Sequence, residues 1–266
     1  MATLAPSAGA SSPAKRADLA RDSRFFAGFA AALAALTFAA FATTYLLPLA
    51  TGRFNGAPIL HLHGVLFLAW PVLLLVQALS STRSRRWHRG LGFAGIALAS
   101  AMVLSGLLAI GSSIETWSAR GVGLAGQAIS IVAFTGLVLF AALFVAAVSA
   151  TRDRSTHARC MLLATFAVMQ GVTGRLGLLV LTGGNPAWLR PGLLPPPPGL
   201  LPVAALHLLF DALFLAVLAL YDRRSLGRVH RATLVGGAAL VAVHSSRHLV
   251  VETAAWAAIA GWLAAL

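Results

Sequence analysis

The sequence is poor in the residues that build most metal and catalytic centres of soluble proteins. It has one cysteine and only seven acidic residues among 266. The single cysteine, Cys160, excludes an intrachain disulfide and a cysteine-rich metal or iron–sulfur site. Charged residues make up 10% of the chain and hydrophobic residues 59%, which is far more apolar than one water-soluble core requires. The composition therefore indicates a membrane protein.

Long apolar runs recur from Phe25 to Leu266, and each can cross a hydrocarbon layer of about 30 Å as a helix. They predict seven spans, near residues 25–48, 59–80, 91–111, 122–149, 160–181, 201–221 and 232–260. We therefore expect an all-α, polytopic helical bundle over residues 24–266. Residues 1–23 are rich in alanine and serine and have nothing to bury, so they are expected to form a disordered cytoplasmic tail.

Basic residues are distributed unevenly between the connections. With the N-terminus in the cytoplasm, the inner segments carry fifteen of the twenty basic residues, and the outer connections carry only Arg53, Arg120 and Arg190. The positive-inside rule thus predicts a cytoplasmic N-terminus. The richness in Ala, Leu, Gly and Arg suits a GC-rich genome, so the expected location is a bacterial inner membrane. The net charge of +13 then reflects topology and anionic lipid at the cytoplasmic loops, and no nucleic-acid partner is expected.

Ionisable residues inside apolar spans are costly to insert, so each is a candidate for function. At about 1.5 Å per residue, the predicted spans place several of them at one level in the outer half of the bundle. Four helices are expected to bring together His63, Arg175, His207, Asp211, His244, Arg247, His248 and Glu252. This convergence predicts a buried polar site.

The spacing of these residues suits a metal ion. His207/Asp211, His244/His248 and His248/Glu252 are i,i+4 pairs, whose side chains share one helix face. Two imidazoles with a third ligand suit Zn²⁺, which would activate a bound water for hydrolysis. The predicted ligands are His244, His248 and His207, with Asp211 or Glu252 as the acid–base group.

Two alternatives remain open from the sequence. A b-type haem would be ligated by His63 together with His207 or His248, and Arg175 and Arg247 complete the candidate cofactor-binding residues. In the other alternative no cofactor is bound. The two arginines then pair with Asp211 and Glu252, hold helices together or receive an anion, and the protein is a membrane carrier or a structural partner in a complex.

Two resemblances to known families accompany these patterns. A group of uncharacterised bacterial multi-span inner-membrane proteins resembles this chain in His61-Leu62-His63-Gly64, Trp70, Gln77 and Trp87-His88-Arg89-Gly90-Leu91-Gly92. That resemblance implies architecture and no activity. The seven-span zinc hydrolase superfamily of ceramidases and adiponectin-receptor-like proteins is similar in its last helix, where this chain has His244-Ser245-Ser246-Arg247-His248. This similarity implies a zinc ligand pair, although the superfamily's motifs in the second and third helices are absent.

Overall fold

A computed structural model describes residues 13–121, 123–181 and 200–266, and within these ranges every regular element is helical. The first span combines α1 (Pro13–Phe41), a π-helical turn η1 (Ala42–Leu46) and α2 (Leu47–Ala50). The other helices are α3 (Pro58–Arg83), α4 (Arg85–Ala119), α5 (Gly123–Ser149), α6 (Arg154–Val168), α7 (Gln170–Leu181), α8 (Leu200–Leu226), α9 (Arg231–Val250) and α10 (Ala254–Ala264).

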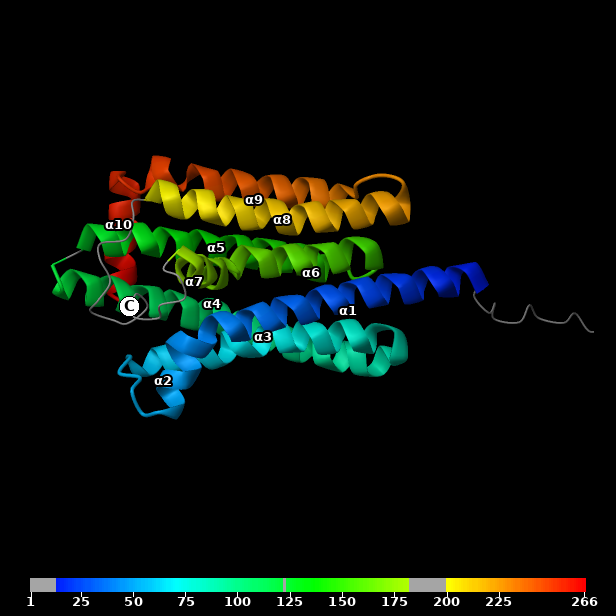
Figure 1. Ribbon diagram of the computed structural model, residues 1–266, viewed down its shortest axis with the longest axis horizontal. Helices are drawn as coiled ribbons and strands as arrows, with labels where there is room; N and C mark the ends of the chain where they lie inside the picture. The colour runs from blue at the N-terminus through cyan, green and yellow to red at the C-terminus, as the bar shows by residue number, and fades with distance from the viewer. Residues whose placement is uncertain (1–12, 122, 182–199) are drawn as a thin grey trace, which may run out of the picture.

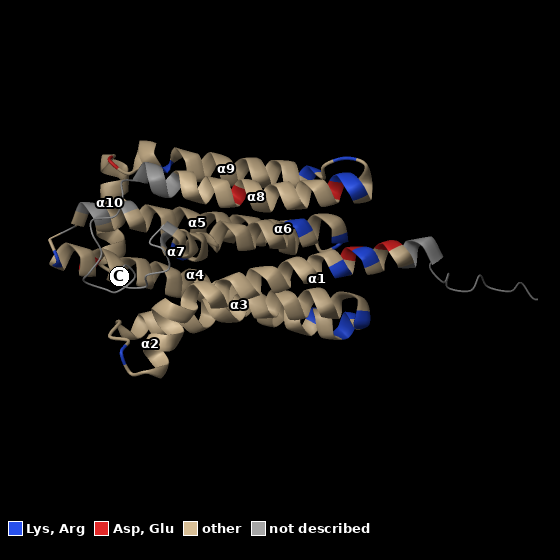
Figure 2. Cartoon of the chain, viewed as in Figure 1, with Lys and Arg blue, Asp and Glu red and all other residues tan. Residues whose placement is uncertain are grey.

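The chain is a multi-pass helical membrane protein, as the sequence predicted. In its described part, five helices are long and apolar enough to cross a membrane, and the number rises to seven if each of two bent helix pairs is one span. Basic side chains gather at one end of the bundle, around the start of α1 and the α3–α4, α5–α6 and α8–α9 turns (Figure 2). We call this the basic end; it is the end that the positive-inside rule predicts to face the cytoplasm.

Three predicted boundaries differ from the structure. The first helix begins at Pro13, so residues 13–23, expected to be disordered, are helical. The run 160–181 is not one straight helix, because α6 and α7 meet at a 50° bend beside Met169. The run 232–260 is also broken, since α9 and α10 meet at 97° and the Thr253 hydroxyl caps the new helix by accepting a hydrogen bond from the Trp256 amide. Hydropathy reveals apolar length but not such bends.

Most helices pack against a neighbour in the sequence, and α9 also packs against α5 and α6 (Figure 1). Contacts join α3 with α4, α4 with α5, α5 with α6, and α8 with α9. The first helix, α1, packs against α3. The short helix α10 crosses the end of α4, where Trp256 and Leu263 are buried with Ile110 and Ile114. A Cβ at Gly111 would lie 2.1 Å from the Leu263 carbonyl oxygen, so only glycine permits this crossing.

Side-chain caps begin four of the helices. Ser84 starts α4, Asp153 starts α6, His230 starts α9 and Thr253 starts α10, each by accepting a hydrogen bond from a backbone amide of the first turn. Such caps satisfy amides that have no partner within the helix. A hydrogen bond from the Thr156 hydroxyl also lowers the pKa of the exposed Asp153 carboxyl below its ordinary value.

A buried ion pair joins α6, α8 and α9 near the basic end. Asp222 is fully buried and accepts hydrogen bonds from Nε and Nη2 of Arg159, at 2.8 and 2.6 Å. Its other carboxylate oxygen accepts from the His230 amide and the Thr233 hydroxyl. The Arg159 Nη1 donates to Ser155. Because both charges are fully hydrogen-bonded, we interpret this basic-end cluster as structural.

Replacing Asp222 by asparagine should destabilise the bundle strongly. The change leaves the buried Arg159 guanidinium without a counter-charge, and losing one partner of a buried pair costs about 3 to 5 kcal/mol. Thermal unfolding in detergent measures the effect. Asp18→Asn, which removes an exposed carboxylate near the same end, is the control and should leave the midpoint unchanged. Equal midpoints for the two variants would contradict the structural role.

Candidate functional site

A second group of buried polar side chains lies between α5, α7, α8 and α9, about 16 Å along α8 from Asp222 toward the end opposite the basic end. We call it the polar centre; its members are Thr135, Gln170, His207, Asp211, His244 and Arg247. All except the partly buried Thr135 are at most 6% exposed. Four of the five predicted residues on α8 and α9 are thus brought together from two neighbouring helices.

The core of the polar centre is a pair between α8 and α9. Nδ1 of His244 lies 2.5 Å from Oδ2 of Asp211, and the imidazole is fully buried. An ionised carboxylate can only accept, so Nδ1 carries the hydrogen. The opposite ring atom, Nε2 of His244, is buried and has no hydrogen-bond partner among the described residues. The pair therefore presents one proton-accepting nitrogen to the surrounding groups.

Arg247 lies one turn beyond His244 and interacts electrostatically with it and with Asp211. Its Nε donates to the Thr135 hydroxyl on α5 at 2.6 Å, and that hydroxyl donates to the Ile131 carbonyl. Nη2 of Arg247 is buried without a partner in the described part of the chain. The guanidinium is thus held in place through Nε, and its N–H groups on Nη2 remain able to donate hydrogen bonds to a ligand.

His207 and Gln170 add further polar atoms. Neither ring nitrogen of His207 and neither side-chain amide atom of Gln170 has a hydrogen-bond partner within the described residues. The His207 ring lies beside the Gln170 carbonyl without reaching hydrogen-bonding geometry, and it interacts electrostatically with Arg247 and His244. Because most buried polar groups in proteins are hydrogen-bonded, this concentration of unpaired atoms distinguishes the polar centre from a structural cluster.

Glycines bring the helices around the polar centre close together. A Cβ at Gly136 of α5 would lie 2.6 Å from the Ala167 carbonyl oxygen of α6. A Cβ at Gly174 of α7 would lie 3.4 Å from Nε2 of His207. Small residues at these positions let polar side chains from α5, α7 and α8 meet in the interior.

Arg175 and His63, predicted for the same site, form a separate group. Arg175 donates from Nε to the Thr44 hydroxyl at 3.2 Å and from Nη1 to the Gly171 carbonyl, and its Cζ lies 4.3 Å from the centroid of the Phe41 ring. His63 interacts electrostatically with it. Thr44 belongs to the π-helical turn η1, a type of irregularity that is frequent at functional sites.

His248 and Glu252 do not join either group. Both are exposed: His248 lies on a face of α9 that no described helix covers, and Glu252 lies beyond the end of α9 at the 97° turn. The predicted ligand set His207, His244 and His248 is therefore not assembled. Among the residues that the structure describes, no three His, Cys, Asp or Glu side chains are arranged to hold a metal ion.

Sequence reasoning did not assign Thr135 and Gln170 to the site. The Thr135 hydroxyl donates to the Ile131 carbonyl of its own helix, as membrane threonines often do, and also accepts from Arg247. Gln170 carries no charge, yet a glutamine within an apolar run is itself costly to bury, and that signal could have identified it.

Removing the Thr135 hydroxyl tests its role as the acceptor of Arg247. Thr135→Val should lower the unfolding free energy by about 1 to 3 kcal/mol, because a buried charged donor loses its partner. Thr116→Val, at an exposed threonine that bonds only to its own helix, is the matched control. Thermal unfolding in detergent compares the two variants. An equally small change in unfolding midpoint for both would contradict a stabilising role for the Arg247–Thr135 hydrogen bond.

Comparison with known proteins identifies no relative for this chain. No family model matches it, no curated protein matches it, and no solved structure matches it.

Proposed function

We propose that this chain is a carrier of a bacterial inner membrane that moves a small anion together with a proton. The observation that supports this is the buried Asp211–His244 pair beside Arg247, surrounded by polar atoms that have no hydrogen-bond partner among the described residues. Ionisable groups this deep in a membrane bundle typically mark ion or proton pathways. The remaining donors of Arg247, His207 and Gln170 are groups that recognise an anion.

The charges of the polar centre couple the two species. With Asp211 ionised, His244 neutral and Arg247 charged, the centre has no net charge. Proton uptake at Nε2 of His244 gives it one net positive charge, which attracts an anion. Proton loss removes that attraction, so each ion's binding favours the other's. The empty carrier and the carrier loaded with both ions are then favoured over the carrier that holds only one of them.

The broken span supports a carrier. Gln170 is the first residue of α7, so the N-terminal end of this half-helix lies at the polar centre, beside the 50° bend. Many transporters place discontinuous helices at the substrate site near the middle of the membrane, with helix N-termini directed at anionic groups. The bend also provides a place at which the bundle can change shape.

Reconstitution into liposomes that contain a pH-sensitive dye tests the proposal. We expect an inward gradient of phosphate, sulfate or malonate to acidify the interior for at least one of these anions. His244→Ala should slow this acidification about tenfold or more, the effect of losing about 1.4 kcal/mol of binding free energy. His248→Ala is the matched control, since it makes the same change one turn away at an exposed position and should retain the wild-type rate.

Two results would contradict the carrier. One is the absence of acidification with every anion of the panel in liposomes that contain folded protein. The other is an equal loss of rate in His244→Ala and His248→Ala, because the exposed His248 lies outside the polar centre.

A cofactor centre is the second candidate function. His244 has one nitrogen bonded to a carboxylate and the other unpartnered in the described structure, which is the usual pattern of a metal-ligating histidine. Both ring nitrogens of His207, which lies nearby, are also unpartnered among the described residues. This donor set suits the zinc or b-type haem predicted from the sequence only in part, because two imidazoles lie beside the positive charge of Arg247. The carrier therefore accounts for more of the centre.

Elemental analysis and an absorption spectrum of the purified protein separate the two candidates. The carrier predicts iron and zinc well below one per chain and no haem absorption band. Zinc or iron near one per chain that disappears in both His207→Ala and His244→Ala would instead establish the cofactor centre. The same metal content in both variants as in the wild type would place the metal elsewhere.

A further inference from the structure

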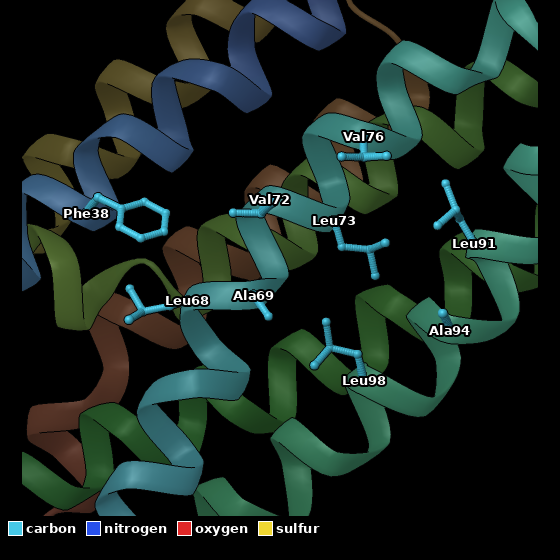
Figure 3. A pocket seen from close by; sticks show the side chains of 9 residues that line it. All are labelled: Phe38, Leu68, Ala69, Val72, Leu73, Val76, Leu91, Ala94 and Leu98. Atoms are coloured by element: carbon cyan, nitrogen blue, oxygen red, sulfur yellow. The ribbon is translucent and has the colours of Figure 1, made fainter.

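An apolar groove lies between α1, α3 and α4, away from the polar centre (Figure 3). Phe38 contributes from α1, five residues contribute from Leu68 to Val76 of α3, and three contribute from Leu91 to Leu98 of α4. The groove has a volume of about 540 Å³ and no polar side chain in its lining. Several lining side chains are exposed, so the groove is open toward the membrane.

The groove has a length suited to one lipid chain, and it lies at the level of one leaflet. From Leu68 to Val76 it extends about 12 Å along α3, and Val76 lies about 10 Å from Arg83 at the basic end. One leaflet provides about 15 Å of hydrocarbon, half of the total thickness. A membrane-spanning partner helix would need about twice this length, so the groove fits an acyl chain better.

Positive charge lies at the end of the groove nearest the basic end. The α3–α4 turn carries exposed arginines on both sides of Ser84: Arg83, Arg85, Arg86 and Arg89. None of them forms an ion pair within the described ranges. Trp87, 70% exposed, lies among them at the level where tryptophan meets the lipid headgroups. Arginine binds phosphate in a bidentate manner, so this turn is suited to a lipid phosphate.

We infer that the groove and the α3–α4 turn together bind one anionic phospholipid, with an acyl chain in the groove and the phosphate at Arg85 and Arg86. The two features are continuous, because Leu91 of the groove follows Arg85 and Arg86 by less than two helical turns on α4. Charge selects the headgroup, and the apolar lining holds the chain. Cytoplasmic leaflets are rich in anionic lipid, which matches the expected orientation of the basic end.

Native mass spectrometry of the full chain in detergent tests this site with phosphatidylglycerol and phosphatidylcholine of identical acyl chains. We expect one phosphatidylglycerol to bind at least about tenfold more tightly than phosphatidylcholine. The double variant Arg85→Gln/Arg86→Gln should lose this preference. Arg223→Gln/Arg224→Gln removes the same charge at the same end but on α8, and should keep it.

Filling the groove provides an independent test. Ala94→Phe should reduce binding of both lipids while circular dichroism and the unfolding midpoint show a folded bundle. Equal affinity for the two lipids in the wild type, or an equal loss in the two arginine variants, would overturn the inference. A dimer in detergent that Ala94→Phe dissociates would overturn it as well, because a second copy would then occupy the groove.

Discussion

Every polar group inside a hydrocarbon layer must find its partner within the protein, and this constraint divides the bundle into two parts. α8 carries two buried carboxylates, Asp222 and Asp211, eleven residues apart. Asp222 accepts from a guanidinium, a hydroxyl and a backbone amide, and its partner Arg159 is itself hydrogen-bonded. Within the described ranges, Asp211 has one hydrogen-bond partner, His244, and Nε2 of that histidine has none. We therefore assign structure to the first carboxylate and function to the second.

The arrangement of the helices agrees with this division. Near the basic end, the Arg159–Asp222 pair ties α6, α8 and α9 together, and capped helix starts satisfy the backbone. Toward the opposite end the helices are irregular: η1 interrupts the first span, α6 bends into α7, and α9 turns into α10. The polar centre and the Arg175 group lie in this irregular half, where a change of shape meets the least resistance.

The sequence predicted the all-helical class, the long apolar helices and the convergence of His207, Asp211, His244 and Arg247, because apolar length and a rise of about 1.5 Å per residue determine depth. It did not predict that His248 is exposed. Periodicity indicates that two residues share a helix face, but not how far the neighbouring helices cover that face. Gln170 carries no charge and sits at a bend that hydropathy cannot detect. The two family resemblances stay predictions.

The most direct test of the account is the state of the His244 ring in lipid. Solid-state or solution NMR of protein with ¹⁵N-labelled histidine in nanodiscs reports which nitrogen carries the hydrogen and how strongly it is bonded. We predict one ring with a strongly hydrogen-bonded Nδ1–H and a bare Nε2, absent in His244→Gln and altered in Asp211→Asn but not in His248→Gln. A spectrum in which Asp211→Asn changes no histidine signal would contradict the Asp211–His244 pair and the function built on it.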